Sequence, residues 1–155
     1  EERVTASGTG LLFRSPRPRR GGEGQGEGAS ASNRSAPQTP FLINPINSAL
    51  ELATRHNAVV VLKGSASVIA APDGRVGVNA TGNPGMATGG MGDALAGIIA
   101  ASLCETDDPF EAACHAVCLH GHAGDHAAAE FGQRGMTVTD LLHAMKRLWI
   151  ELEVG

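Results

Sequence analysis

The stretch from Thr81 to Ala101, TGNPGMATGGMGDALAGIIAA, constrains the fold of this chain more than any other. Six of its residues are glycines, and one acid, Asp93, stands where the glycines end and an apolar run begins. Residues without a Cβ let successive backbone N–H groups converge, and a following helix adds the positive end of its dipole. The pattern predicts a loop that leads into a helix and forms a binding site for an anion such as phosphate.

Asp93 allows two interpretations, which the spacing alone leaves open and which can coexist. As a catalytic base it would take a proton from a hydroxyl group, while the backbone amides around Gly90 and Gly92 stabilise charge on a phosphoryl group. As a helix N-cap it would only accept a hydrogen bond from the first turn. The loop is not a Walker A motif, because no Gly-Lys-Ser/Thr ends it.

Composition divides the chain into two unequal parts. The segment 15–40 is rich in Gly, Ser, Pro, Arg and Glu, and it has almost nothing to bury. We therefore expect residues 1–40 to be a disordered low-complexity segment and residues 41–155 to form one domain. Because only 3% of the 155 residues are aromatic, the core must be built from Ala, Val, Leu and Ile.

Periodicity within the second part predicts an α/β layer architecture. The run AVVVL fits a strand buried on both faces. A first helix is expected to begin near Ser48, with Glu51 completing a capping box. The expected strands are 58–62, 67–71 and 75–79, the last two joined by a turn at 72–74, and the expected helices are 48–56, 92–103, 110–134 and 139–152.

Charge and cysteine content exclude several classes of protein. A formal net charge of −4 argues against a dominant attraction to nucleic acid, and no apolar run is long enough to predict a membrane span. Three cysteines without a regular framework fit a reducing compartment, so we expect a cytoplasmic location. A zinc site is a weaker alternative because no Cys-x-x-Cys pair is present; its candidate ligands are Cys114, His115, Cys118, His120, His122 and His126.

Three segments in the same order resemble the NAD(P)H-hydrate dehydratases, repair enzymes of the ribokinase-like superfamily that depend on ADP or ATP. They are TGNPGMATGGMGDALAGIIAA, the upstream VVVLKGSASVIAAPDGRVGVNATGNPGMATGG and the downstream AVCLHGHAGDHAAAEFGQRGMTVTDLLHAM. The resemblance covers roughly residues 57–148 and implies the C-terminal portion of a ribokinase-like three-layer α/β/α fold. Met91 stands where the family usually has Thr, and we expect its side chain to point away from the amides.

The resemblance implies dehydration of the S form of hydrated NADH or NADPH at the expense of ADP or ATP, with Mg²⁺ held by the nucleotide phosphates rather than by protein ligands. Asp93 would be the catalytic base and would contact the substrate, and the amides of Gly90, Met91 and Gly92 would hold the transferred phosphoryl group. Nucleotide contacts are expected from Lys63, Gly64, Ser65, Ala66, Ser67, Asn83, Thr88 and Gly92. The matching segment with His120, Gly121, Ala123, Gly124 and Asp125 is expected to serve mainly in helix packing beneath the nucleotide.

The resemblance also implies partners and leaves alternatives. A homo-oligomer is expected, and an NAD(P)H-hydrate epimerase is raised as a partner. The family's N-terminal half, with its Thr-Pro-His-Pro-Gly-Glu segment, has no counterpart in this sequence, which suggests a C-terminal fragment. A parallel sheet lacking several strands would expose an unpaired edge and favour self-association. The alternatives are a small-metabolite kinase of the same superfamily, of the hydroxyethylthiazole or sugar type, and a non-catalytic nucleotide-binding fragment.

Overall fold

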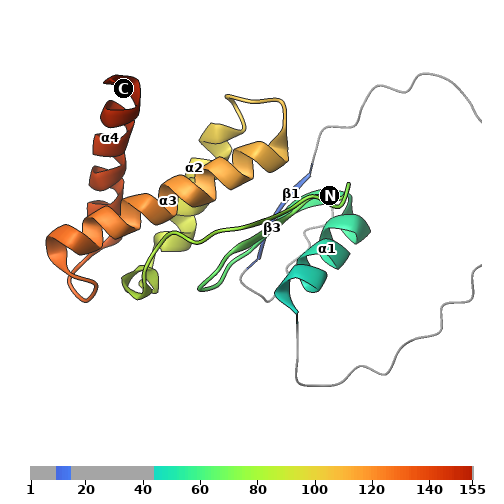
Figure 1. Cartoon of the computed structure of the whole chain (residues 1–155), viewed down its shortest axis with the longest axis horizontal. Coiled ribbons are helices and arrows are strands. Elements are labelled where there is room, and N and C mark those ends of the chain that lie inside the picture. Colours follow the sequence, from blue (N-terminus) through green and yellow to red (C-terminus); the bar gives the residue numbers. More distant parts are fainter. Residues whose placement is uncertain (1–9, 15–43, 155) are drawn as a thin grey trace, which may run out of the picture.

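The protein is seen here in a computed structural model that describes residues 10–14 and 44–154 (Figure 1). Four strands form one sheet in the order β1-β2-β3-β4, and every neighbouring pair is antiparallel. The strands are β1 (Gly10–Arg14), β2 (Ala58–Leu62), β3 (Val68–Ala70) and β4 (Val76–Val78). The helices are α1 (Pro45–His56), the 3₁₀ turn η1 (Pro84–Met86), α2 (Met91–Ser102), α3 (Pro109–Phe131) and α4 (Val138–Val154).

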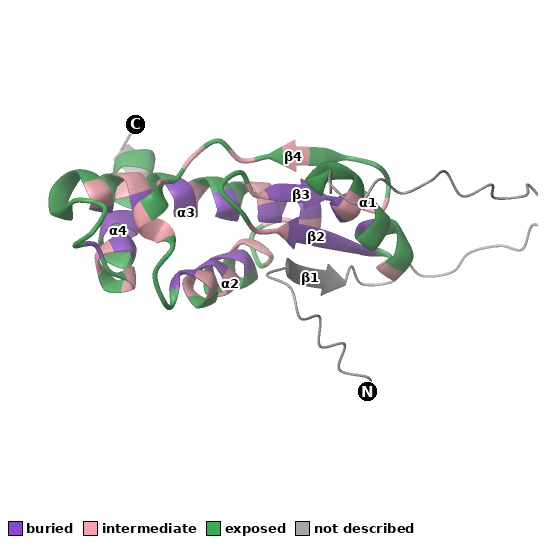
Figure 2. Ribbon diagram, turned by 90° about the horizontal axis from the view of Figure 1, so that it is seen from below, coloured by how far each residue is buried: buried purple, intermediate pink, exposed green. Residues whose placement is uncertain are grey.

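The sheet has helices on both faces, as the predicted α/β architecture requires. Val60 packs with Ala49 and Ala53 of α1, whereas Val59 and Val61 belong to the cluster formed with α2, α3 and α4. Successive side chains of a strand point to opposite faces, so β2 is buried on both, as AVVVL predicted. In Figure 2 the buried residues follow β2, β3 and the inner side of α3.

Two expectations about the sheet need correction. The family resemblance led us to expect a parallel sheet, whereas all described strand pairs are antiparallel, because β2, β3 and β4 are joined by short connections that reverse the chain. For β3 and β4 the predicted turn at 72–74 had already indicated this reversal. The second concerns the segment 1–40, whose composition did not indicate a strand. Its residues 10–14 form β1, in which Leu12 pairs with Val60, and the rest of that segment lies outside the described residues.

The start of α1 also differs from the prediction. The helix begins at Pro45, and its N-cap is Asn44, whose Oδ1 accepts a hydrogen bond of 3.0 Å from the Ile46 amide. Pro45 suits the first helical position because its fixed φ is helical and its missing N–H would have had no partner there. Ser48 therefore lies inside the helix and is not its cap. The other predicted helices and strands are present with ends shifted by a few residues.

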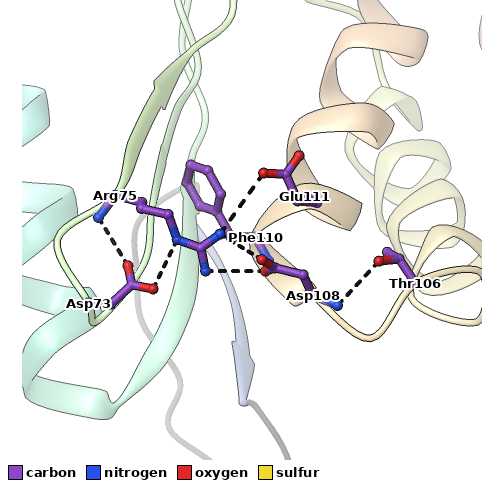
Figure 3. Close-up of polar contacts among 6 residues, drawn as sticks. All are labelled: Asp73, Arg75, Thr106, Asp108, Phe110 and Glu111. Carbon is purple, nitrogen blue, oxygen red and sulfur yellow. Dashed lines mark hydrogen bonds and ion pairs between the residues drawn. The ribbon is translucent and has the colours of Figure 1, made fainter.

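The turn between β3 and β4 is tied to the start of α3 by a charged cluster (Figure 3). Arg75 donates from Nη1 to Asp108 Oδ2 at 2.6 Å and from Nε to Asp73 Oδ2 at 2.9 Å. Its guanidinium lies 4.7 Å from the ring centroid of Phe110. Asp108 is also the N-cap of α3, because its Oδ1 accepts from the Phe110 amide at 2.9 Å. One exposed arginine thus connects the sheet to the longest helix.

Large apolar side chains are exposed on β4 and on α4. Val76 and Val78 of β4 are 36% and 56% exposed, at a strand edge that pairs with no other described strand. The C-terminal part of α4 projects away from the sheet (Figure 1), where Trp149 is 44% exposed. None of the helices among the described residues is long and apolar enough to cross a membrane.

Candidate active site

A cavity of about 610 Å³ opens between the end of β2, the loop that precedes η1, and the start of α2. Of the residues predicted for nucleotide binding, seven line this cavity: Lys63, Gly64, Ser65, Ser67, Asn83, Thr88 and Gly92. Ala66, Gly90 and Asp93 do not line it. The structure therefore brings the Lys63–Ser67 segment and the glycine-rich loop together, although they are separated in the sequence.

The glycine loop ends in a helix start that has no side-chain cap. Gly90 is the N-cap of α2 at a φ of 87°, a backbone conformation that glycine adopts without strain. Asp93 lies at the third helical position and is exposed, so the N-cap interpretation of Asp93 is wrong. Met91 is 4% exposed and belongs to the core cluster, and it also lines the cavity. The first N–H groups of α2 thus lack intrahelical partners and are available to an anion.

Lys63 crosses directly over this helix start. A Cβ placed on Gly92 would lie 2.5 Å from Lys63 Nζ, so the ammonium lies close to the backbone of this first turn, and a side chain there would move it. Within the described part of the chain, no carboxylate lies within ion-pair distance of Lys63. A cation beside the positive end of a helix is electrostatically unfavourable until an anion binds between them. The donor set therefore fits a phosphate group.

The loop on the opposite wall is held in place by α3. Asp125 accepts a hydrogen bond of 2.9 Å from the Gly82 amide and one of 3.0 Å from Asn83 Nδ2. Asn83 Nδ2 also donates to the Gly124 carbonyl, and Asn83 Oδ1 accepts from the Gly85 amide. Both N–H bonds of the Asn83 side chain are thus used in shaping the loop. Asp125, which we expected to serve mainly in helix packing, holds this wall through its two hydrogen bonds.

Two glycines of α3 allow the loop to lie against the helix. A Cβ on Gly121 would stand 2.8 Å from the Thr81 carbonyl carbon, and one on Gly124 would overlap the Met86 side chain. Thr81 Oγ1 donates to the Cys118 carbonyl at 3.1 Å across the same contact. The packing role expected for these glycines is therefore seen in the structure. No local signal in the sequence indicates that their partners are Thr81 and Met86.

The residues of the zinc alternative do not come together. Cys104 and Cys118 are exposed free thiols, and Cys114 is a half-buried one whose pKa is raised by burial. His120 is buried and turns toward α2, where its Nε2 lies 3.0 Å from the Met91 carbonyl oxygen. In the ranges 10–14 and 44–154, no group of three or more His, Cys, Asp or Glu side chains is arranged to hold a metal ion.

Comparisons of this chain with known proteins all point to the same family. The family model described as NAD(P)H-hydrate dehydratase matches residues 42–147. The solved structure of the ADP/ATP-dependent NAD(P)H-hydrate dehydratase from Bacillus subtilis, co-crystallised with ATP and Mg²⁺, superposes with a TM-score of 0.66 at 37% identity. That superposition covers 70% of this chain and 39% of the Bacillus chain.

Curated relatives agree with the structural match. The bifunctional NAD(P)H-hydrate repair enzyme Nnr of Escherichia coli is 46% identical over 103 residues, which are 66% of this chain and 20% of the relative. The ADP-dependent (S)-NAD(P)H-hydrate dehydratase of Bacillus subtilis is 39% identical over 105 residues, 68% of this chain and 38% of the relative. The chain thus spans a fifth to two fifths of the length of these relatives. It belongs to the NAD(P)H-hydrate dehydratase family.

Proposed function

We propose that this chain binds the phosphates of ADP or ATP in the cavity at the start of α2 and takes part in dehydrating hydrated NADH or NADPH. The observation that carries the proposal is the approach of Lys63 Nζ to Gly92 beside an uncapped helix start. A single carbon atom added to Gly92 would require the ammonium group to move. The names of the Bacillus relative, which is called ADP-dependent, and of the solved structure, which was co-crystallised with ATP and Mg²⁺, support the same choice of nucleotide.

Each residue then has a distinct part. Lys63 and the amides around Gly92 bind and orient the phosphates, since a cation and free N–H groups both stabilise negative charge. The nucleotide supplies the phosphoryl group and carries Mg²⁺ on its oxygens. Asp93, exposed at the third position of α2, accepts the proton of the substrate hydroxyl.

The proposal extends to partners and location. It includes a homo-oligomer, an NAD(P)H-hydrate epimerase as a functional partner, and a cytoplasmic location. Self-association is supported by the exposed apolar side chains of Val78 on β4 and of Trp149 and Ile150 on α4.

A non-catalytic nucleotide-binding chain is the second candidate. The observation that favours it is that Asp93 does not line the cavity where the phosphates would bind. In that case the cavity binds nucleotide, but no base acts on a hydrated cofactor.

One assay separates the two candidates. Purified chain is mixed with hydrated NADH, Mg²⁺ and either ADP or ATP, and recovery of NADH absorbance is followed beside nucleotide binding by calorimetry. We expect Asp93→Asn to bind nucleotide and lose turnover, and Gly92→Ala to weaken nucleotide binding about tenfold, because the new methyl group displaces Lys63. Gly97→Ala is the matched control, since a Cβ there meets nothing within 4 Å.

The outcomes are distinct. Binding without recovery of absorbance in the unmodified chain would establish the non-catalytic candidate. Unchanged turnover in Asp93→Asn would remove Asp93 from the mechanism. Absence of nucleotide binding in the folded, unmodified chain would overturn the proposed function as a whole.

A further inference from the structure

His120 stands apart from the other residues around the cavity. It is the one polar or charged side chain that is buried among the described residues, with 8% of its surface exposed. Its Nε2 lies 3.0 Å from the carbonyl oxygen of Met91, the first residue of α2. The two residues are 29 positions apart, so this contact joins the middle of α3 to the start of the helix that carries the free amides. The proposed function makes no use of it.

The chemistry of the contact fixes the state of the ring. A carbonyl oxygen only accepts hydrogen bonds, so Nε2 carries the proton and donates it. Burial, which is the largest influence, lowers the pKa of His120, and the Lys63 ammonium lowers it further, whereas the bond to Met91 acts in the opposite direction. Near neutral pH the ring is therefore uncharged, with its hydrogen on Nε2.

The start of α2 has few other side chains to hold it. Gly90, its N-cap, has no side chain, and Gly92 follows two residues later. Polar N-cap side chains ordinarily stabilise a first helical turn, and this helix has none. The bond from His120, which is buried and lines the cavity, reaches the same turn through the Met91 carbonyl.

We propose that His120 is a positioning residue, which holds the first turn of α2 through the Met91 carbonyl and so keeps the amides around Gly92 aimed at a phosphate. That the amides bind a phosphate rests on the proposed function. The contact itself is a property of the free chain, so it can be tested without any ligand.

Three variants separate positioning from simple packing. In His120→Gln the side-chain amide can still donate to the Met91 carbonyl, whereas His120→Leu fills the space without a donor. Ala127→Gly, buried on the same helix and outside the cavity lining, is the control for a general loss of stability. The readouts are the ¹⁵N shifts of the His120 ring and hydrogen exchange of the Ala94 amide, which donates to the Gly90 carbonyl at 2.9 Å.

The expected results are specific. In the unmodified chain the ring nitrogens should show the neutral form with hydrogen on Nε2. Exchange at Ala94 should become about fivefold to tenfold faster in His120→Leu, which corresponds to the loss of one hydrogen bond. In His120→Gln the exchange rate at Ala94 should be close to that of the unmodified chain. The same should hold for Ala127→Gly when the two chains are compared at matched global stability. With Mg²⁺-ADP present, affinity should fall in His120→Leu and recover in His120→Gln.

Other results would overturn the inference. A ring with its hydrogen on Nδ1, or equal exchange at Ala94 in the unmodified chain and His120→Leu, excludes positioning. If His120→Leu fails to fold, the ¹⁵N shifts of the His120 ring in the unmodified chain and the exchange of the Ala94 amide in His120→Gln still test the inference. A chain that shows the expected ring state and exchange but binds no ADP contradicts the proposed function and leaves the positioning of α2 intact.

Discussion

The long helix α3 meets the rest of the chain at two junctions that are built in different ways. Near its start, Asp108 pairs with the exposed guanidinium of Arg75, which also lies against the buried ring of Phe110 (Figure 3). In its middle, Gly121 and Asp125 meet the loop around Gly82 through close backbone approach and hydrogen bonds to main-chain groups. The first junction places a turn of the sheet, and the second places a wall of the cavity. Because the two junctions are built differently, we expect them to differ in how well they tolerate amino-acid substitution.

The two junctions differ in how far they are exposed to solvent and in how closely their atoms pack. Exposed ion pairs gain little free energy, because water and salt screen them and two long side chains must be ordered. A close-packed backbone contact has no such freedom, since an added atom must displace main chain. We therefore expect the second junction to be far more sensitive to substitution than the first.

Gly121→Ala should have the largest effect. Its Cβ would stand 2.8 Å from the Thr81 carbonyl carbon, so the loop must move or the helix must shift. We expect a loss of about 1–3 kcal/mol in the free energy of unfolding by urea. Gly97→Ala, in α2 with nothing within 4 Å, is the control and should stabilise by up to about 1 kcal/mol. Equal results for the two variants would mean that close approach does not hold the loop.

Asp125→Ala should come second. It removes the acceptor for the Gly82 amide and one acceptor for Asn83 Nδ2, which keeps its bond to the Gly124 carbonyl. We expect a loss of about 1–2 kcal/mol in urea unfolding, and a shifted Gly82 amide resonance in NMR spectra. The neighbouring exposed His126→Ala should leave both unchanged. An unmoved Gly82 resonance in Asp125→Ala would show that the carboxylate does not anchor the loop.

Arg75→Met should have a smaller effect at the other junction. Methionine keeps an apolar stem against Phe110 and removes the guanidinium. We expect Tm to fall by less than in either variant above. The fall should shrink further in about 1 M salt, because salt at that concentration screens most of the interaction energy of exposed ion pairs. A fall as large as that of Gly121→Ala, or one insensitive to salt, would erase the contrast between the junctions.

Acid pH should give the smallest change. The hydrogen bonds from Arg75 hold the pKa of Asp108 below its usual value of 3.8, and the Arg75 amide and side chain do the same for Asp73. A carboxyl whose pKa is lower in the folded chain contributes stability above its unfolded pKa and loses it as pH falls through the lower folded pKa. The Tm of the unmodified chain should therefore fall below about pH 4 by more than that of Arg75→Met. Parallel pH curves for the two chains would contradict the ion-pair account.

Local patterns predicted the elements of this fold well, and long-range contacts much less well. The strand AVVVL and the helix after Gly92 follow from periodicity, because burial repeats every two or every 3.6 residues. The turn at 72–74 indicated that β3 and β4 run in opposite directions, whereas no such turn was recognised between β2 and β3, and the antiparallel order of that pair was missed. The N-cap of α1 was misplaced because the sequence offers two patterns typical of a helix start, Asn44 followed by Pro45 and Ser48 followed by Glu51. The helix begins at the first of them.

The site shows the same division. Lys63 and Gly92 were identified from the family resemblance, and the structure brings them together at the cavity. Asp125 and His120 were expected to pack. Their hydrogen bonds reach Gly82 and Met91, which precede them by 43 and 29 positions, and no spacing within α3 encodes those partners. The role of Asp93 as a base stays a prediction.

The lone tryptophan has a consequence for spectroscopy. The chain has one Trp and no Tyr, so Trp149 provides nearly all of its near-ultraviolet emission. This indole is 44% exposed near the end of α4 and does not line the cavity. Its fluorescence therefore follows the surroundings of α4, and a nucleotide titration followed by emission alone would stay flat even if binding were tight. A blue shift that grows with protein concentration would instead indicate that α4 becomes covered when chains associate.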